Sequence, residues 1–99
     1  MTAVGDWTFL TNYAHVLLVI AAEPDIRLRD VAEQVGITER ATQRIVRELA
    51  NEGYLEMERI GRRNRYVVIE NRPLRHPMEQ QHNVGELIAL LRSDPVATR

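Results

Sequence analysis

The sequence predicts an α+β fold that is mostly α-helical, with a core of three helices, a β-hairpin and one further C-terminal helix. Three observations lead to this prediction. Residues 11–51 contain three stretches with the apolar spacing of amphipathic helices. Residues 54–70 contain two strand-like runs around a glycine turn, and a last apolar helical segment follows two prolines within residues 73–77. The predicted order is therefore helix, short strand, helix, helix, hairpin, helix.

Length and composition restrict the class of protein. With 99 residues, of which 44% are hydrophobic and 27% are charged, the chain can form one ordinary globular domain of modest stability. It contains no cysteine, which excludes disulfides and thiolate metal sites. No apolar run approaches the roughly 20 residues that span a bilayer. We therefore expect a soluble protein of the cytoplasm.

The first three helices are marked by apolar spacing and by their ends. The first lies in TNYAHVLLVIAA and stops at Pro24. The following DIRL, residues 25–28, is too short for more than a bridging strand. The second helix lies in RDVAEQVG, where Gly36 is the terminating residue. Thr38 is a good N-cap for the third, which we expect to run to about Asn51.

The second half of the chain predicts a hairpin and a separate last helix. YLEMERI alternates apolar and charged residues, RYVVIE is β-branched and aromatic, and residues 61–64 between them have the composition of a turn. After the prolines, VGELIALLRS has helical spacing. We accordingly divide the chain into a domain of residues 1–72, with an N-terminal extension, and residues 73–99, a loop and a helix.

The third helix carries polar side chains with the chemistry of a DNA-binding surface. Only GIT separates it from the second helix, and a short glycine-containing turn between two helices is typical of a helix-turn-helix. Apolar residues and threonines occupy one face, which leaves Arg40, Gln43, Arg44 and Arg47 on the other. Arginine can bind guanine or phosphate and glutamine can bind adenine. The alternative is a solvated face on which Arg44 and Glu48 form an ordinary i, i+4 pair.

A second cluster of arginines occurs in the hairpin. The whole chain has a formal charge of −1, yet residues 36–66 sum to +2 because seven arginines oppose five glutamates. The segment RIGRRNRY, residues 59–66, which we call the wing segment, concentrates this charge at the turn. A hairpin after a helix-turn-helix is a wing, whose tip can contact phosphates or a narrow minor groove. The predicted DNA-binding residues are Thr38, Arg40, Gln43, Arg44, Arg47, Arg62, Arg63, Asn64 and Arg65.

The stretch LRDVAEQVGITERATQRIVRELANEGYLEMERIGRRNRY resembles the winged helix-turn-helix of MarR-like and ArsR-like bacterial transcriptional regulators. The resemblance covers about residues 11–69 and is carried by Val-Ala, Gly-Ile-Thr, Arg-Ile-Val, Gly-Tyr-Leu and the arginine-rich hairpin. It implies a DNA-binding regulator. Thr42 departs from the family pattern, which has an inward valine there, and we expect its methyl group to pack inward. The long dimerisation helices of MarR-like proteins do not fit in this chain, so their effector pocket is not carried over.

A homodimer is expected, because one small module contacts too little duplex for tight binding, whereas two modules read a pseudo-palindrome. The last helix offers an apolar stripe, and two aromatic residues near the N-terminus could pack beside it. The predicted dimerisation residues are Trp7, Phe9, Val84, Leu87, Ile88 and Leu91. The alternative is that the last helix folds back on its own domain.

Other functions have less support in the sequence. The three histidines have no firm metal-binding spacing, and His15 is expected to be structural. No phosphate loop, nucleophile elbow or carboxylate–histidine set indicates an enzyme, and no cofactor is expected. Two alternatives to DNA binding remain: a winged helix that binds proteins, and a sensor that holds an apolar ligand in a dimer cleft.

Overall fold

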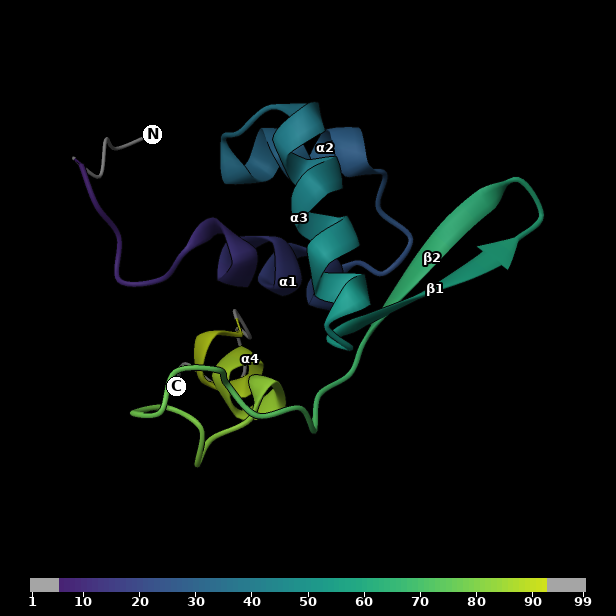
Figure 1. Ribbon diagram of the computed structural model, residues 1–99. Coiled ribbons are helices and arrows are strands. Elements are labelled where there is room, and N and C mark those ends of the chain that lie inside the picture. Colours follow the sequence, from purple (N-terminus) through teal and green to yellow (C-terminus); the bar gives the residue numbers. More distant parts are fainter. Residues whose placement is uncertain (1–5, 93–99) are drawn as a thin grey trace, which may run out of the picture.

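A computed structural model describes residues 6–92 and contains the predicted helices and hairpin in the predicted order (Figure 1). The elements are α1 (Asn12–Ala22), α2 (Leu28–Val35), α3 (Glu39–Asn51), β1 (Leu55–Ile60), β2 (Arg63–Val68) and α4 (Val84–Leu91). The first three helices pack against one another, and the antiparallel strands β1 and β2 extend from the end of α3. This is a winged helix-turn-helix with an additional C-terminal helix, as the sequence predicted.

The turn between α2 and α3 forms as its residues dictate. Gly36 has a φ of 90°, a left-handed conformation that glycine adopts without the steric cost of a Cβ. The hydroxyl oxygen of Thr38 accepts a hydrogen bond of 3.0 Å from the Ala41 N–H, so Thr38 is the predicted N-cap. These two residues fix where α2 stops and α3 begins. They therefore set the angle at which α3 is presented.

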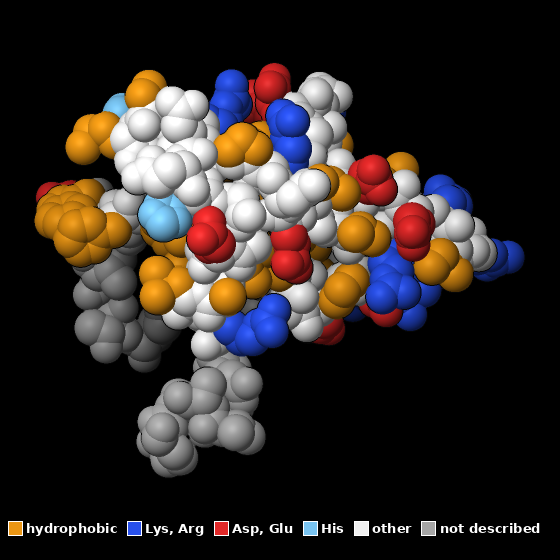
Figure 2. Space-filling model, turned by 90° about the horizontal axis from the view of Figure 1, so that it is seen from below, with side chains coloured by type: hydrophobic (Ala, Val, Ile, Leu, Met, Phe, Trp, Pro, Cys, Tyr) orange, Lys and Arg blue, Asp and Glu red, His pale blue; other side chains and the backbone are white. Residues whose placement is uncertain are grey.

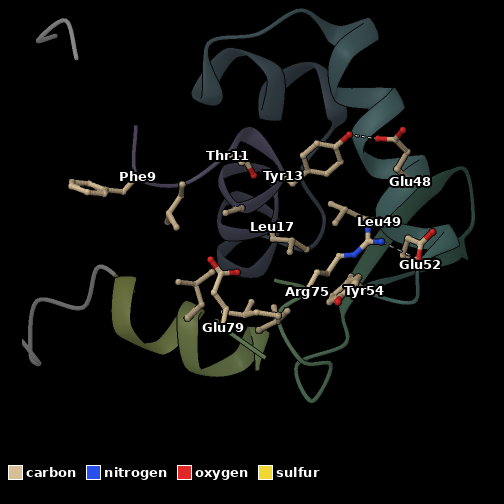
Figure 3. Close-up of a pocket in the computed structure, with 15 residues that line it drawn as sticks. Phe9, Thr11, Tyr13, Leu17, Glu48, Leu49, Glu52, Tyr54, Arg75 and Glu79 are labelled. Atoms are coloured by element: carbon tan, nitrogen blue, oxygen red, sulfur yellow. Dashed lines mark hydrogen bonds and ion pairs between the residues drawn. The ribbon is translucent and has the colours of Figure 1, made fainter. Parts of the chain in front are cut away.

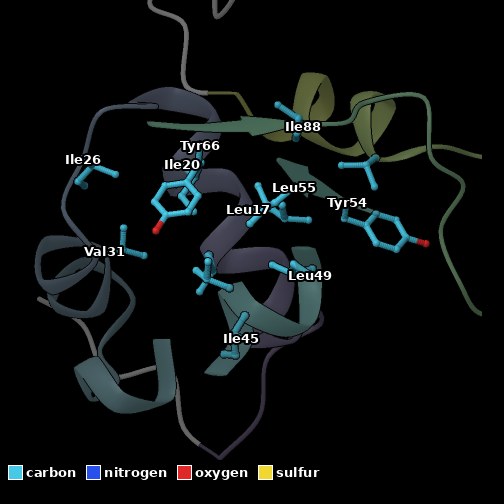
Figure 4. Packing of buried hydrophobic residues seen from close by; sticks show 13 residues of the cluster. Leu17, Ile20, Ile26, Val31, Ile45, Leu49, Tyr54, Leu55, Tyr66 and Ile88 are labelled. Atoms are coloured by element: carbon cyan, nitrogen blue, oxygen red, sulfur yellow. The ribbon is translucent and has the colours of Figure 1, made fainter. Parts of the chain in front are cut away.

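The hydrophobic core lies between α1, α2, α3 and the base of the hairpin (Figure 4). Val16, Ile20 and Val31 are fully buried. Thr42 is fully buried as well, and its hydroxyl donates a 3.0 Å hydrogen bond to the Thr38 carbonyl. The inward position predicted for Thr42 is confirmed, because its one polar group is satisfied within the helix.

The hairpin turn is tighter than the sequence indicated. We expected residues 61–64 to form the turn, but Arg63 pairs with Ile60 and Asn64 pairs with Arg59, so both belong to β2. Only two residues connect the strands. Gly61 has a φ of 62°, the left-handed conformation that two-residue hairpin turns favour. The wing segment is thus mostly strand, with Arg62 at its tip.

The bridging strand expected at residues 25–28 does not form. A single backbone hydrogen bond, of 3.1 Å from the Tyr66 N–H to the Pro24 carbonyl, joins this stretch to β2. The Arg27 carbonyl instead accepts the first hydrogen bonds of α2, and Leu28 already belongs to that helix. Ile26 still contributes to the core, with 5% of its surface exposed. Because Arg27 caps α2 and Leu28 lies within it, too few residues remain for a strand.

Helix α4 folds back against α1, and this corrects part of the predicted dimer surface. Val84 and Ile88 are 2% and 4% exposed and lie in the core with Leu17 and Leu55 (Figure 4). Since they are buried within their own chain, they are not available to a partner in this conformation. A capping box, in which Asn83 and Glu86 exchange backbone-to-side-chain hydrogen bonds, fixes the start of α4. Across residues 6–92, no helix has both the length and the apolar character to cross a membrane.

The junction between α3 and the hairpin is held by side chains from the segment after β2. Gly53, with a φ of 86°, lets the chain leave α3 and enter β1. The guanidinium of Arg72 lies over the Tyr54 ring, 5.3 Å from its centroid, and donates a 3.0 Å hydrogen bond to the Glu52 carbonyl. The Tyr54 hydroxyl donates a 2.6 Å hydrogen bond to the Pro73 carbonyl.

Candidate nucleic-acid interface

The outer face of α3 is polar and exposed, whereas its inner face is buried. Thr42, Ile45, Val46 and Leu49 pack into the domain. The predicted contact residues Arg40, Gln43, Arg44 and Arg47 are all exposed, and none of them forms a side-chain hydrogen bond or ion pair within residues 6–92. An α-helix of about 10–12 Å diameter matches a major groove about 12 Å wide. The division of faces read from the sequence is confirmed, and the DNA contacts stay a prediction.

Arg44 is not paired with Glu48, which was the alternative interpretation of this face. No ion pair joins them in the described part of the chain, and the Glu48 carboxylate accepts a hydrogen bond from the Tyr13 hydroxyl instead. This hydrogen bond raises the pKa of Tyr13 above its usual value. Helix α1 thus supplies the side-chain partner that Glu48 has within the described residues.

Thr38 lies at the positive end of α3, where backbone N–H groups favour anions. Its hydroxyl oxygen already accepts a hydrogen bond from the Ala41 N–H, but its proton remains for a donor contact. The side chain is exposed. Thr38 can therefore cap α3 and donate to a phosphate at the same time.

The wing carries four exposed arginines, but they differ in their contacts. Arg62, at the turn, forms no hydrogen bond or ion pair among residues 6–92. Arg59 donates a 3.1 Å hydrogen bond to the Gly61 carbonyl within the same turn. Figure 2 shows positive side chains gathered at the end of the molecule formed by the hairpin. Arg62 is the wing residue that the structure leaves most open to a phosphate.

Arg63 and Arg65 both contact Asp25 in the loop between α1 and α2. Arg63 Nη2 donates a 3.3 Å hydrogen bond to the Asp25 carbonyl, and Arg65 Nε lies 3.8 Å from Asp25 Oδ1. Alternate residues of a strand share a face, so these two arginines project together. Sequence reasoning missed Asp25, because it lies 38 residues from Arg63 and no local pattern connects them. Both arginines are held in place, and the Asp25 carboxylate partly neutralises Arg65.

Asn64 lies between Arg63 and Arg65 in β2. Because successive side chains of a strand point to opposite faces, it faces away from these two arginines. It faces the same way as Arg59, its cross-strand partner. The predicted wing residues therefore do not form one surface. The turn brings Arg62 to the tip, and the strand distributes the others over two faces.

The helix and the wing lie next to each other in space. Figure 1 shows the hairpin projecting from the C-terminal end of α3, beyond the three packed helices. This geometry suits a duplex, with the helix in a groove and the hairpin arginines beside the sugar–phosphate backbone. Within residues 6–92, no group of three or more histidine, aspartate or glutamate side chains could hold a metal ion.

Comparison with known families agrees with this geometry. Residues 15–56 match the family described as winged helix-turn-helix DNA-binding. The match begins in α1, includes α2 and α3, and ends in β1. No curated protein matches the chain. The protein is a winged helix, and its helical core is similar to the DNA-binding domains of the winged helix-turn-helix family.

Proposed function

We propose that this protein is a transcriptional regulator that binds double-stranded DNA sequence-specifically as a homodimer. Helix α3 enters the major groove, and the wing contacts the backbone or the minor groove. The observation that carries the proposal is the outer face of α3, where three arginines and a glutamine are exposed without intramolecular partners in the described residues. The proposal includes a place among MarR-like or ArsR-like bacterial regulators and a location in the cytoplasm.

The side chains have different roles in this proposal. Gln43 and Arg44 lie centrally on the exposed face and read base edges, because both residue types can form two hydrogen bonds with one base. Arg40, Arg47 and Thr38 hold phosphates on either side of them. Arg62 contacts the backbone from the tip of the wing, and such contacts position the protein without reading sequence.

The dimer surface in this proposal consists of the exposed apolar residues that remain near the N-terminus and on α4. Trp7 and Phe9 are 68% and 92% exposed, and their rings lie edge to face with centroids 5.0 Å apart. Leu91 is 43% exposed and Leu87 is partly buried. Figure 2 shows hydrophobic side chains exposed at the end of the molecule opposite the wing. Exposed aromatic side chains are typical of association surfaces.

The function is tested by selecting duplexes from a random pool and measuring affinity at several salt concentrations. A regulator enriches one pseudo-palindromic sequence, and its affinity falls steeply with salt because phosphate contacts release counterions. A protein-interaction module gives no enriched sequence and no steep salt dependence for duplex binding. That second result would reject DNA binding.

The dimer is tested by replacing Leu87 and Leu91 with Glu together. In a two-fold interface each substitution appears twice, so four carboxylates meet and repel. We expect folded monomers with weakened operator binding. Light scattering measures the mass, and circular dichroism confirms the fold. A monomeric unmutated protein at micromolar concentration would contradict the dimer.

A further inference from the structure

A pocket of about 520 Å³ lies between α1, the C-terminal half of α3, α4 and the loop before α4 (Figure 3). Its walls are mostly apolar, with the aromatic rings of Phe9, Tyr13 and Tyr54 beside the aliphatic residues Leu10, Leu17, Leu49, Leu74, Val84 and Leu87. Pockets that hold small organic ligands are of this size and are lined mostly by hydrophobic groups. On α3, Leu49 reaches the pocket from the buried face of the helix, whereas the exposed Glu48 lines its rim one turn away from Arg44. The pocket therefore adjoins the proposed DNA surface at Glu48.

The polar groups around the pocket are mainly negative. Three carboxylates, from Glu48, Glu52 and Glu79, oppose one guanidinium, that of Arg75. Figure 3 shows Glu48 and Glu52 on the side of α3 and Glu79 apart from them, near α4. Arg75 Nη2 lies 3.9 Å from Glu52 Oε1 and balances that carboxylate. Two negative charges remain without a basic partner in the described residues, on Glu48 and Glu79.

The hydrogen bond from Tyr13 does not neutralise Glu48. The Tyr13 hydroxyl is an uncharged donor, so its hydrogen bond to the Glu48 carboxylate brings no positive charge to the pocket. The pocket also lies at the C-terminal end of α3, where the aligned peptide dipoles leave a partial negative charge. The carboxylate side chains and the helix dipole therefore both favour a positively charged ligand.

We propose that this pocket binds an apolar organic cation, such as an aromatic or alkyl ammonium or phosphonium compound. The apolar walls take up the apolar body, and the carboxylates of Glu48 and Glu79 attract the positive charge. An anion of the same shape would be repelled by the same two carboxylates and should bind more weakly. Phe9 and Leu87 line this pocket and also belong to the proposed dimer surface, so the pocket lies beside that surface. The proposal goes beyond DNA binding and does not rest on it, because its test measures ligand binding itself.

The test uses two ions of similar shape and opposite charge, tetraphenylphosphonium and tetraphenylborate. Isothermal titration calorimetry of the full chain with each ion measures affinity and stoichiometry. We expect one tetraphenylphosphonium per chain and an affinity that weakens as salt rises. Tetraphenylborate should bind at least about tenfold more weakly, the factor that corresponds to a modest difference in charge interaction. Equal binding of the two ions, or binding of neither, would overturn the proposal.

Two variants locate the binding in this pocket. Glu48→Gln with Glu79→Gln keeps the shape of the carboxylates but removes their charge, and should weaken phosphonium binding about three- to tenfold. The matched control is Glu56→Gln, since Glu56 is an exposed carboxylate of β1 that does not line the pocket. Ala14→Leu fills the pocket from α1 and should abolish binding in a chain with an unchanged melting curve. If the control weakens binding as much as the double variant, or if Ala14→Leu leaves it unchanged, the ion binds elsewhere and the assignment is wrong.

Discussion

The two arginine-rich regions of this protein, the outer face of α3 and the wing, differ in their contacts with the rest of the chain. On α3 the arginines are exposed and have no side-chain partners in the described residues. The neighbouring Glu48 accepts a hydrogen bond from Tyr13. On the hairpin, Arg63 and Arg65 contact Asp25, and Arg59 contacts its own turn. Positive charge of similar density is thus open on the helix and partly engaged on the wing. In the proposed complex, we therefore expect α3 to supply most of the specificity, and the wing to supply a part of the affinity that depends on Asp25.

The largest effect on specific DNA binding is expected from substitutions on the exposed face of α3. Gln43→Ala or Arg44→Ala should cost about 1–3 kcal/mol of specific binding, because a bidentate base contact is lost. Non-specific binding should change less. Electrophoretic mobility shift or fluorescence anisotropy with the selected duplex and a scrambled duplex measures both. Arg92→Ala is the control, since Arg92 is exposed beyond α4 and outside the proposed interface. A parallel loss on both duplexes would assign these side chains to phosphates.

The wing should respond differently. Arg62→Ala should weaken binding to all duplexes about equally and lower the slope of log K against log salt by about 1, as expected for one lost phosphate contact. Arg62→Ala with Arg63→Ala should add less than a second full unit, because Arg63 is already bonded to Asp25. Melting temperature should barely move for these exposed side chains. An unchanged affinity and slope in the double variant would exclude the wing from the interface.

Substitution of Asp25 tests directly how much the wing arginines contribute to DNA affinity. Asp25→Asn removes the negative charge beside Arg65 and should raise affinity for every duplex by about two- to fivefold, within the range of exposed ion pairs. The gain should shrink at high salt. Asp30→Asn is a comparison with another acidic residue, whose partner Arg27 lies outside the wing. A loss of affinity in Asp25→Asn would mean that Asp25 orients the arginines more than it neutralises them.

The smallest effect should come from Tyr13. In Tyr13→Phe the Glu48 carboxylate loses its donor and can pair with Arg44 one turn away. Specific affinity should fall about twofold, since such pairs contribute only a few tenths of a kcal/mol. Adding Glu48→Gln should restore it, and anisotropy titrations of the two single variants and the double variant complete the cycle. If Glu48→Gln gives no recovery, Tyr13 acts on packing and not on charge.

Local signals explain which features could be predicted from the sequence. Gly36 and Thr38 determine the helix-turn-helix through backbone conformation and capping, so the elements they bound were predicted to within a residue or two. The exposure of the α3 face followed from helical periodicity, because Ile45 and Leu49 have no other place than the core. Patterns of this kind depend on residues close together in the chain.

The features that escaped prediction depend on contacts between distant residues. Asp25 meets Arg63 across 38 positions, and the fold-back of α4 depends on space beside α1 that Val84 and Ile88 fill. The same apolar stripe would suit a partner or the protein's own core, and only the tertiary packing decides between them. The pocket beneath α3 likewise requires four segments to meet, and no local pattern of the sequence indicates it.

Gly53 lies at the base of the hairpin, so a small rotation of the backbone there would move the hairpin tip by a larger distance. A six-residue strand at about 3.3 Å per residue is roughly 20 Å long, so a rotation of about 5° at this junction would displace Arg62 by about 2 Å. That distance separates a formed from a broken phosphate hydrogen bond. The contacts of Arg72 with the Tyr54 ring and the Glu52 carbonyl hold this junction, and they therefore help to fix the position of the wing tip relative to α3. In the proposed complex, changes to these contacts would alter the spacing along the duplex between the site bound by α3 and the phosphate bound by Arg62.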